Sequence, residues 1–149
     1  MKIALACDHA GFPLKEEILK VLKEAGVAVD DLGCASETSV DYPDFAGLVA
    51  ERVSAGQADR GILLCGTGVG MAITANKFKG VRAAAINDLL TAKMSREHND
   101  LNVLCLGGRV VQPAVVRKIV KMFLETPFAG GRHEKRVEKI KKIEDKNCG

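Results

Sequence analysis

The chain of 149 residues contains no tryptophan and one tyrosine, and its aromatic content is 4%. Proteins that grip single-stranded nucleic acid stack the bases on aromatic side chains, so no nucleic-acid partner is expected. No apolar run approaches the ~20 residues that span a bilayer, and the N-terminus enters a strand-like run without a signal peptide's charged and apolar regions. We therefore expect no membrane partner and a cytoplasmic location.

The chain also lacks the spacings that hold metals. None of its five cysteines form a C-x-x-C pair, which argues against a zinc ribbon or a thioredoxin-type centre. These are Cys7, Cys34, Cys65, Cys105 and Cys148. No two of the three histidines have ligand spacing with a carboxylate. We expect neither a metal nor a cofactor, and reduced thiols.

What is present is a regular alternation of two patterns. Apolar, β-prone runs predict strands at 3–7, 27–32, 61–64, 81–86 and 102–106, and amphipathic spacing predicts helices near 14–25, 45–53, 68–78, 89–97 and 113–124. Near-continuous apolar strands are typical of a parallel sheet covered on both faces. The expected fold is α/β, a three-layer sandwich around a five-stranded parallel sheet of flavodoxin-like (Rossmann-like) order, 2-1-3-4-5.

A C-terminal helix is expected from Arg132 to about Asp145, with residues 146–149 as a frayed tail of a single domain, 1–149. Arg132, Arg136 and Lys139 share one stripe of this helix. The net charge of +3 is only weak evidence about partners, so the stripe is either a solvated face or an anion site.

The segment Cys65-Gly66-Thr67-Gly68-Val69-Gly70 follows the third predicted strand. In the expected strand order the topological switch point, where the chain begins to add strands on the other side of strand 1, lies between strands 1 and 3. Open α/β sheets bind ligands at this point. Asp8-His9, directly after strand 1, should therefore face this loop across a crevice. The loop offers a thiol beside backbone N–H groups that glycines allow to approach an anion.

Several known motifs do not fit this loop. A cysteine-phosphatase loop needs an arginine where Met71 stands, and a P-loop would end in Gly-Lys-Ser/Thr rather than Gly70-Met71-Ala72. The glycine spacing also misses the dinucleotide fingerprint. A turn with only structural glycines remains an alternative.

His98 and Asn99 precede the fifth strand, at the edge of the sheet opposite the crevice. We expect them to serve the crevice of a neighbouring subunit, in a homodimer (or tetramer) with shared sites.

Segments along nearly the whole chain resemble ribose-5-phosphate isomerase type B, in the family that includes galactose-6-phosphate isomerase subunits. The matching segments are 7–11, 41–43, 65–70, 75–77, 95–100, 107–111 and 130–133. The resemblance implies a metal-independent aldose–ketose isomerase of the pentose phosphate pathway, acting on a phosphorylated sugar, ribose 5-phosphate.

By this resemblance Cys65 is the base that moves a proton between C1 and C2, while Thr67 and His98 assist ring opening and hydroxyl proton transfer. The implied substrate-binding residues are Asp8, His9, Gly66, Thr67, Gly68, Val69, Gly70, Asn99, Arg109, Arg132 and Arg136. An isomerase of another phosphosugar, of the allose or galactose 6-phosphate type, and a non-catalytic phosphosugar-binding module are the alternatives.

Overall fold

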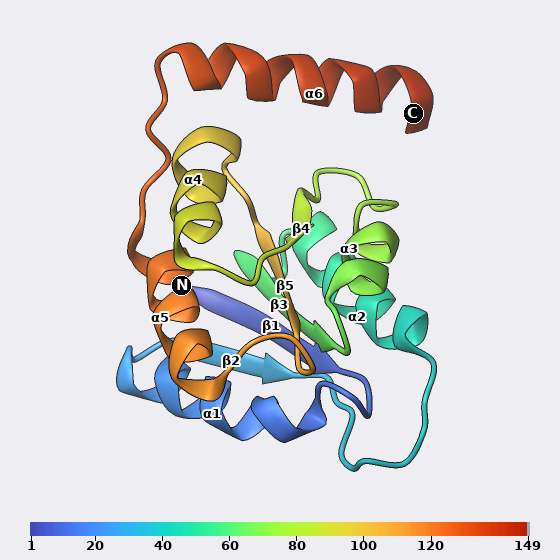
Figure 1. Ribbon diagram of the computed structural model, residues 1–149. Coiled ribbons are helices and arrows are strands. Elements are labelled where there is room, and N and C mark those ends of the chain that lie inside the picture. Colours follow the sequence, from blue (N-terminus) through green and yellow to red (C-terminus); the bar gives the residue numbers. More distant parts are fainter. Residues whose placement is uncertain (149) are drawn as a thin grey trace.

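The computed structural model describes residues 1–148, which form a sheet between two layers of helices (Figure 1). The strands of this part are β1 (Lys2–Cys7), β2 (Ala28–Asp31), β3 (Arg60–Cys65), β4 (Ala83–Ala85) and β5 (Val103–Gly107). The helices are α1 (Phe12–Glu24), α2 (Tyr42–Ser54), α3 (Val69–Ala75), α4 (Leu89–Asn99), α5 (Pro113–Glu125) and α6 (Arg132–Cys148). The predicted fold class is confirmed, and each predicted element is present within a few residues.

The sheet is parallel throughout and runs β2-β1-β3-β5-β4. The predicted reversal between β1 and β3 is present, but the last two strands exchange places relative to the predicted order 2-1-3-4-5. Their burial explains the exchange. All five residues of β5 are buried, as an interior strand requires, whereas β4 has three half-buried alanines and suits an edge.

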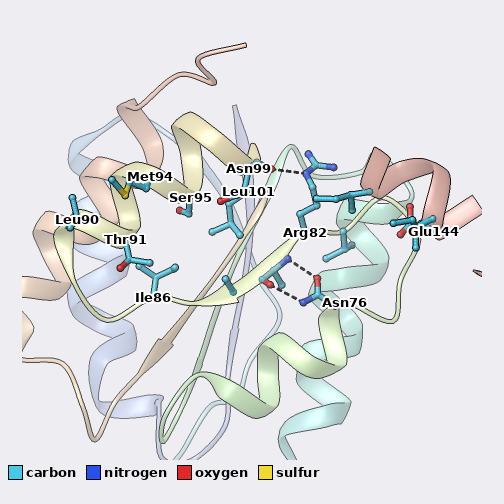
Figure 2. A pocket seen from close by; sticks show the side chains of 15 residues that line it. Asn76, Arg82, Ile86, Leu90, Thr91, Met94, Ser95, Asn99, Leu101 and Glu144 are labelled. Atoms are coloured by element: carbon cyan, nitrogen blue, oxygen red, sulfur yellow. Dashed lines mark hydrogen bonds between the residues drawn. The ribbon is translucent and has the colours of Figure 1, made fainter. Parts of the chain in front are cut away.

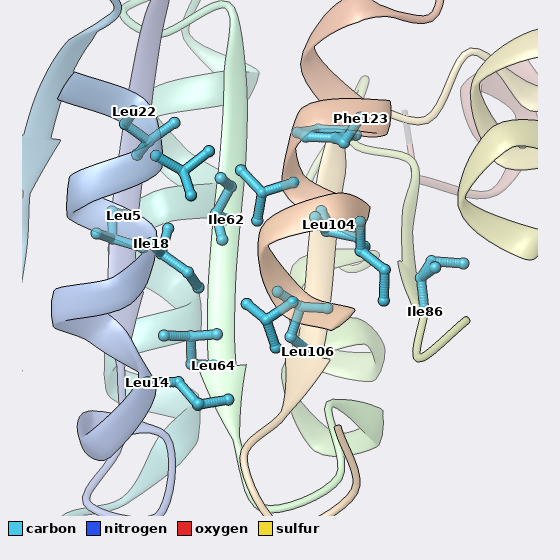
Figure 3. Packing of buried hydrophobic residues seen from close by; sticks show 14 of the residues in the cluster. Leu5, Leu14, Ile18, Leu22, Ile62, Leu64, Ile86, Leu104, Leu106 and Phe123 are labelled. Carbon is cyan, nitrogen blue, oxygen red and sulfur yellow. The ribbon is translucent and has the colours of Figure 1, made fainter. Parts of the chain in front are cut away.

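Alternation along the strands separates two apolar cores. Ile and Leu side chains of β1, β3 and β5 pack against α1 and α5, where Leu22, Ile62 and Phe123 interdigitate (Figure 3). The intervening, mostly smaller residues, such as Ala4, Ala6 and Cys65, face α2 and α3. Gly61 allows the closest approach on this side, because a Cβ there would meet Val49 at 2.5 Å. Cys65 therefore lies on the α2–α3 face of the sheet.

Helix α6 lies across α4 and beyond the edge strand β4, joined to α5 by an extended linker (Figure 1). Its carboxylate Glu144 accepts the Gly80 N–H at 3.0 Å, and Lys79 pairs with Asp145 at 2.9 Å. The helix continues to Cys148, past the predicted end at Asp145, and Gly149 of the predicted frayed tail lies outside the described residues. Within residues 1–148, none of the helices has the length and apolar character needed to cross a membrane.

Candidate active site

The ends of β1 and β3 form one wall of a cavity of about 490 Å³, at the predicted switch point. The Asp8 N–H donates to the Leu64 carbonyl at 2.9 Å, which ties the two strand ends together. The lining residues are Asp8, His9, Ala10, Tyr42, Cys65, Gly66, Thr67, Val69, Gly70, Ile73 and Arg109. The predicted meeting of Asp8-His9 with the Cys65 loop is therefore confirmed.

Cys65 ends β3, and its thiol accepts a backbone hydrogen bond. The Gly68 N–H lies 3.1 Å from Cys65 Sγ, and Gly68 has a φ of 83°, a conformation that glycine adopts without steric cost. A hydrogen bond to the charged form favours that form, so this donor stabilises a thiolate. Helix α3 begins at Val69, directly after this amide.

Two of the loop amides are already engaged inside the loop. Gly68 is buried below the cavity and bonds the thiol, and the Val69 N–H donates to Thr67 Oγ1 at 3.3 Å. Thr67 itself is exposed, and Val69 is 51% exposed at the cavity wall. Of the predicted loop residues, Gly66, Thr67, Val69 and Gly70 line the cavity, while Gly68 acts from beneath it.

The other strand cysteines are unsuited to acid–base chemistry. Burial raises the pKa of Cys7 to about 12, and it also raises the pKa of Cys105, so both stay protonated near neutral pH. The predicted burial of these two thiols is confirmed. Among the described cysteines, Cys65 is the one that lines the cavity.

Asp8 and His9, directly after β1, line the cavity beside the Cys65 loop. Asp8 Oδ1 accepts the N–H groups of Ala10 and Gly11 at 2.9 and 3.0 Å, which holds the β1–α1 turn. His9 Nδ1 accepts the Val40 N–H at 3.2 Å. The neutral imidazole therefore carries its proton on Nε2 and can donate from that atom.

Arg109 reaches the cavity because β5 lies beside β3. Its guanidinium passes over Gly66, where a Cβ would stand 3.2 Å from Arg109 Nη1. In the predicted order β4 would have taken this place, and Arg109 would have started one strand further away. An exposed arginine at the cavity rim suits a phosphate, which guanidinium groups bind in a bidentate manner.

Tyr42 and Ile73 line the cavity but were not assigned a role from the sequence. The Tyr42 ring occupies the space above Gly70, where a Cβ would meet ring carbons at 2.6 Å. The sequence did contain one indication that Tyr42 has a role in the site: the only tyrosine of the chain lies in segment 41–43, which resembles the isomerase family.

His98, Asn99, Arg132 and Arg136 do not line the Cys65 cavity of their own chain. The His98 ring stacks on the His133 ring with centroids 4.1 Å apart, where α6 begins. The two arginines line a basic hollow of about 320 Å³ on α6 with Lys135 and Lys139. As expected from the sequence, the residue pair 98–99 lies near the N-terminal ends of the strands, opposite the cavity (Figure 1).

Asn99 instead borders an apolar groove of about 570 Å³ between β4, α4 and α6. Figure 2 shows Leu90 and Met94 of α4 on one side of this groove and Glu144 of α6 on the other. Leu90 is 64% exposed and Ile143 of α6 is 63% exposed. Large apolar side chains are thus exposed to solvent beside Asn99, one of the predicted site residues that lie away from the Cys65 cavity.

A thiol that accepts an amide hydrogen bond, a histidine and a rim arginine lie together at this cavity, an arrangement that can support proton transfer on a small anionic substrate. Residues 3–140 match the model of the ribose/galactose isomerase family, and the chain belongs to that family. It is 50% identical to ribose-5-phosphate isomerase B of Escherichia coli over 145 residues, 97% of each chain.

Solved structures agree. Ribose-5-phosphate isomerase B of Clostridium thermocellum has a TM-score of 0.95 and 51% identity, covering 98% of this chain and 99% of its own. The Mycoplasma genitalium enzyme of the same name, with bound ribulose-5-phosphate, has a TM-score of 0.94 and 45% identity, covering 98% and 97%.

Proposed function

We propose that this protein interconverts ribose 5-phosphate and ribulose 5-phosphate, as an aldose–ketose isomerase of the pentose phosphate pathway. The observation that carries the proposal is Cys65, which lines the cavity and whose thiol accepts the Gly68 N–H at 3.1 Å. A thiolate held in this way can act as a base toward a carbon-bound proton. Relatives with this activity in their names align over nearly the full chain.

In the proposed reaction the Cys65 thiolate takes the C2 proton of the open-chain aldose and returns it to C1. The enediolate formed between these steps carries charge on oxygen, which hydrogen-bond donors at the cavity stabilise. We propose His9 Nε2–H and the loop amides of Gly66 and Gly70 as these donors, a role supported by the fact that all three residues line the cavity. Thr67, together with His98 supplied by the other subunit, assists ring opening and moves hydroxyl protons. Arg109 binds the phosphate, and Asp8 binds a sugar hydroxyl.

We further propose a homodimer with shared sites, in which His98, Asn99, Arg132 and Arg136 complete the cavity of the other subunit. Two features support this. These residues belong to the end of the sheet opposite their own cavity, and the groove beside them exposes Leu90, Met94 and Ile143. Covering such a patch with a second copy would remove apolar area from water, which favours association.

The reaction needs no cofactor in this scheme, because proton transfer uses only side chains and backbone donors. We place the enzyme in the cytoplasm, a proposal supported by the free thiols of Cys7, Cys34, Cys65 and Cys105. Reducing compartments keep such thiols unpaired.

The decisive experiment compares Cys65→Ala with Cys34→Ala, since both cysteines are 5% exposed and, of the two, only Cys65 lines the cavity. Loss of the base should lower kcat about 10²- to 10⁴-fold with KM little changed. Cys34→Ala should retain kcat. A panel of phosphorylated pentoses and hexoses, assayed with the wild type, tests the substrate. Undiminished turnover by Cys65→Ala would refute the role of the thiol.

The shared site is tested by mixing subunits. Cys65→Ala and Arg132→Ala homodimers should each be nearly inactive, while heterodimers formed after mixing should regain activity in one of their two sites. Full activity of a verified wild-type monomer, by sedimentation at assay concentration, would rule out shared sites.

A further inference from the structure

The peptide unit between Thr67 and Gly68 is held on both sides. Its N–H, that of Gly68, points at Cys65 Sγ at 3.1 Å, and its carbonyl, that of Thr67, faces Asn87 Nδ2 at 3.5 Å. A trans peptide is planar, and its N–H and C=O point in opposite directions. A donor that holds this carbonyl therefore also sets the direction of the N–H that reaches the thiol.

Asn87 is itself oriented by the sheet. Its Oδ1 accepts the Gly107 N–H at the end of β5, at 3.1 Å. Because a backbone N–H can only donate, the amide oxygen must face Gly107, and the NH₂ group must then face the Thr67 carbonyl. The preceding residue, Ile86, is buried and bonds the Cys105 carbonyl at 2.9 Å, which anchors the segment.

The glycine makes such control necessary. Gly68 has a φ of 83°, and glycine tolerates backbone conformations that other residues avoid, so the Thr67–Gly68 peptide has access to the flipped orientation. A flipped peptide would turn a carbonyl oxygen toward Sγ and the N–H away from it. That arrangement disfavours a thiolate, because the oxygen carries partial negative charge.

We infer that Asn87 is a positioning residue, which holds the Thr67–Gly68 peptide so that its N–H stabilises the Cys65 thiolate. The inference rests on the proposed function in one respect only, that the Cys65 thiolate is catalytic. It predicts that Asn87 governs the reactivity of Cys65 without touching the substrate.

The test is the rate at which iodoacetamide alkylates Cys65 at pH 7, followed by mass spectrometry. Trypsin cuts after Arg60 and Lys77 and releases residues 61–77, in which Cys65 is the only cysteine. Loss of one modest hydrogen bond should slow alkylation about three- to tenfold in Asn87→Ala. With substrate, kcat should fall by a similar factor while KM stays unchanged.

Two further variants sharpen the result. Asn87→Asp has the same shape and still accepts the Gly107 N–H but cannot donate to the Thr67 carbonyl, so it should also be slow. Asn102→Ala is the matched control, because Asn102 likewise bridges two backbone groups, the Arg82 N–H at 2.7 Å and the Gly80 carbonyl at 2.8 Å, at the opposite end of β5. It should alkylate at the wild-type rate.

A wild-type alkylation rate in Asn87→Ala would overturn the inference. A wild-type rate in Asn87→Asp alone would also overturn it, because the only role then left to Asn87 would be to accept the Gly107 N–H. If Asn87→Ala does not fold by circular dichroism, the isosteric Asn87→Asp decides. The alkylation assay contains no substrate. Failure of the isomerase proposal, seen as an active Cys65→Ala, is therefore distinguishable from failure of this one.

Discussion

Replacing Gly68 by alanine tests whether one backbone conformation supports both the fold and the thiol. At a φ of 83° an L-residue with a Cβ costs about 1–2 kcal/mol. The new Cβ would also stand 3.2 Å from the carbonyl carbon and oxygen of Cys105, and backbone atoms of a buried strand cannot move aside freely. We expect a loss of about 2 kcal/mol in the free energy of unfolding, which corresponds to a Tm lower by about 4–8 °C.

The same substitution should disturb the thiol. If the backbone relaxes toward negative φ, the Gly68 N–H turns away from Cys65 Sγ. Hydrogen bonds to charged groups contribute about 1.5–3 kcal/mol, so alkylation of Cys65 should slow roughly 10- to 100-fold. Thermal melts followed by circular dichroism and peptide-resolved alkylation rates measure the two effects separately.

Gly26 provides a matched control at the end of α1. Its φ is 68°, close to that of Gly68, but a Cβ there would meet nothing within 4 Å. Gly26→Ala should lower the Tm by the strain alone and leave alkylation unchanged. If Gly68→Ala lowers the Tm but alkylates at the wild-type rate, then the left-handed glycine does not place the N–H at the thiol, and the reasoning fails.

Three further changes test the core, the helix packing and the attachment of α6. Phe123→Ala should destabilise the fold by about 3–5 kcal/mol in urea denaturation, because its ring is 1% exposed and also lies 5.3 Å from the Arg60 guanidinium. Gly61→Ala should cost about 1–3 kcal/mol through overpacking against Val49 while the alkylation rate of Cys65 stays unchanged. Desolvation, and then the facing His98, lower the pKa of His133 below its ordinary 6.5, so the docked form resists protonation. Stability from this contact is present above pH ~6.5 and is lost as the pH falls, so the protection factors of the α6 amides, which correct for the intrinsic exchange rate at each pH, should decrease on acidification. His133→Phe keeps a stacked ring, and a pH response of the protection factors that persists in it would contradict this explanation.

Local patterns were sufficient for much of the fold. The apolar runs of β1, β3 and β5 and the glycine after α1 are local signals, and each predicted element formed. The exchange of β4 and β5 was not predictable from pattern alone, since both runs read as strands. The order depends on which of the two strands buries both of its faces. In the assembled sheet all five residues of β5 are buried, whereas the three alanines of β4 are half-buried.

The candidate site, like the fold, was predictable from the sequence only in part. Asp8-His9 and the Cys65 loop were predictable as neighbours, because parallel strands bring their carboxyl ends to one edge and the reversal of strand order opens a crevice there. Tyr42 and Asn87 reach the loop from segments distant along the chain, through contacts that no local spacing encodes.

By itself, then, the sequence determined the kind of chemistry: a thiol and glycines after a buried strand, with basic side chains to hold an anion. Only the tertiary structure decided how that chemistry is assembled. It set Arg109 beside Gly66 through the strand exchange, brought Asn87 to the Thr67 carbonyl, and left His98 and the α6 arginines away from their own cavity. The physical reason is range: propensity and periodicity act over a few residues, whereas these contacts depend on packing between segments far apart in the chain.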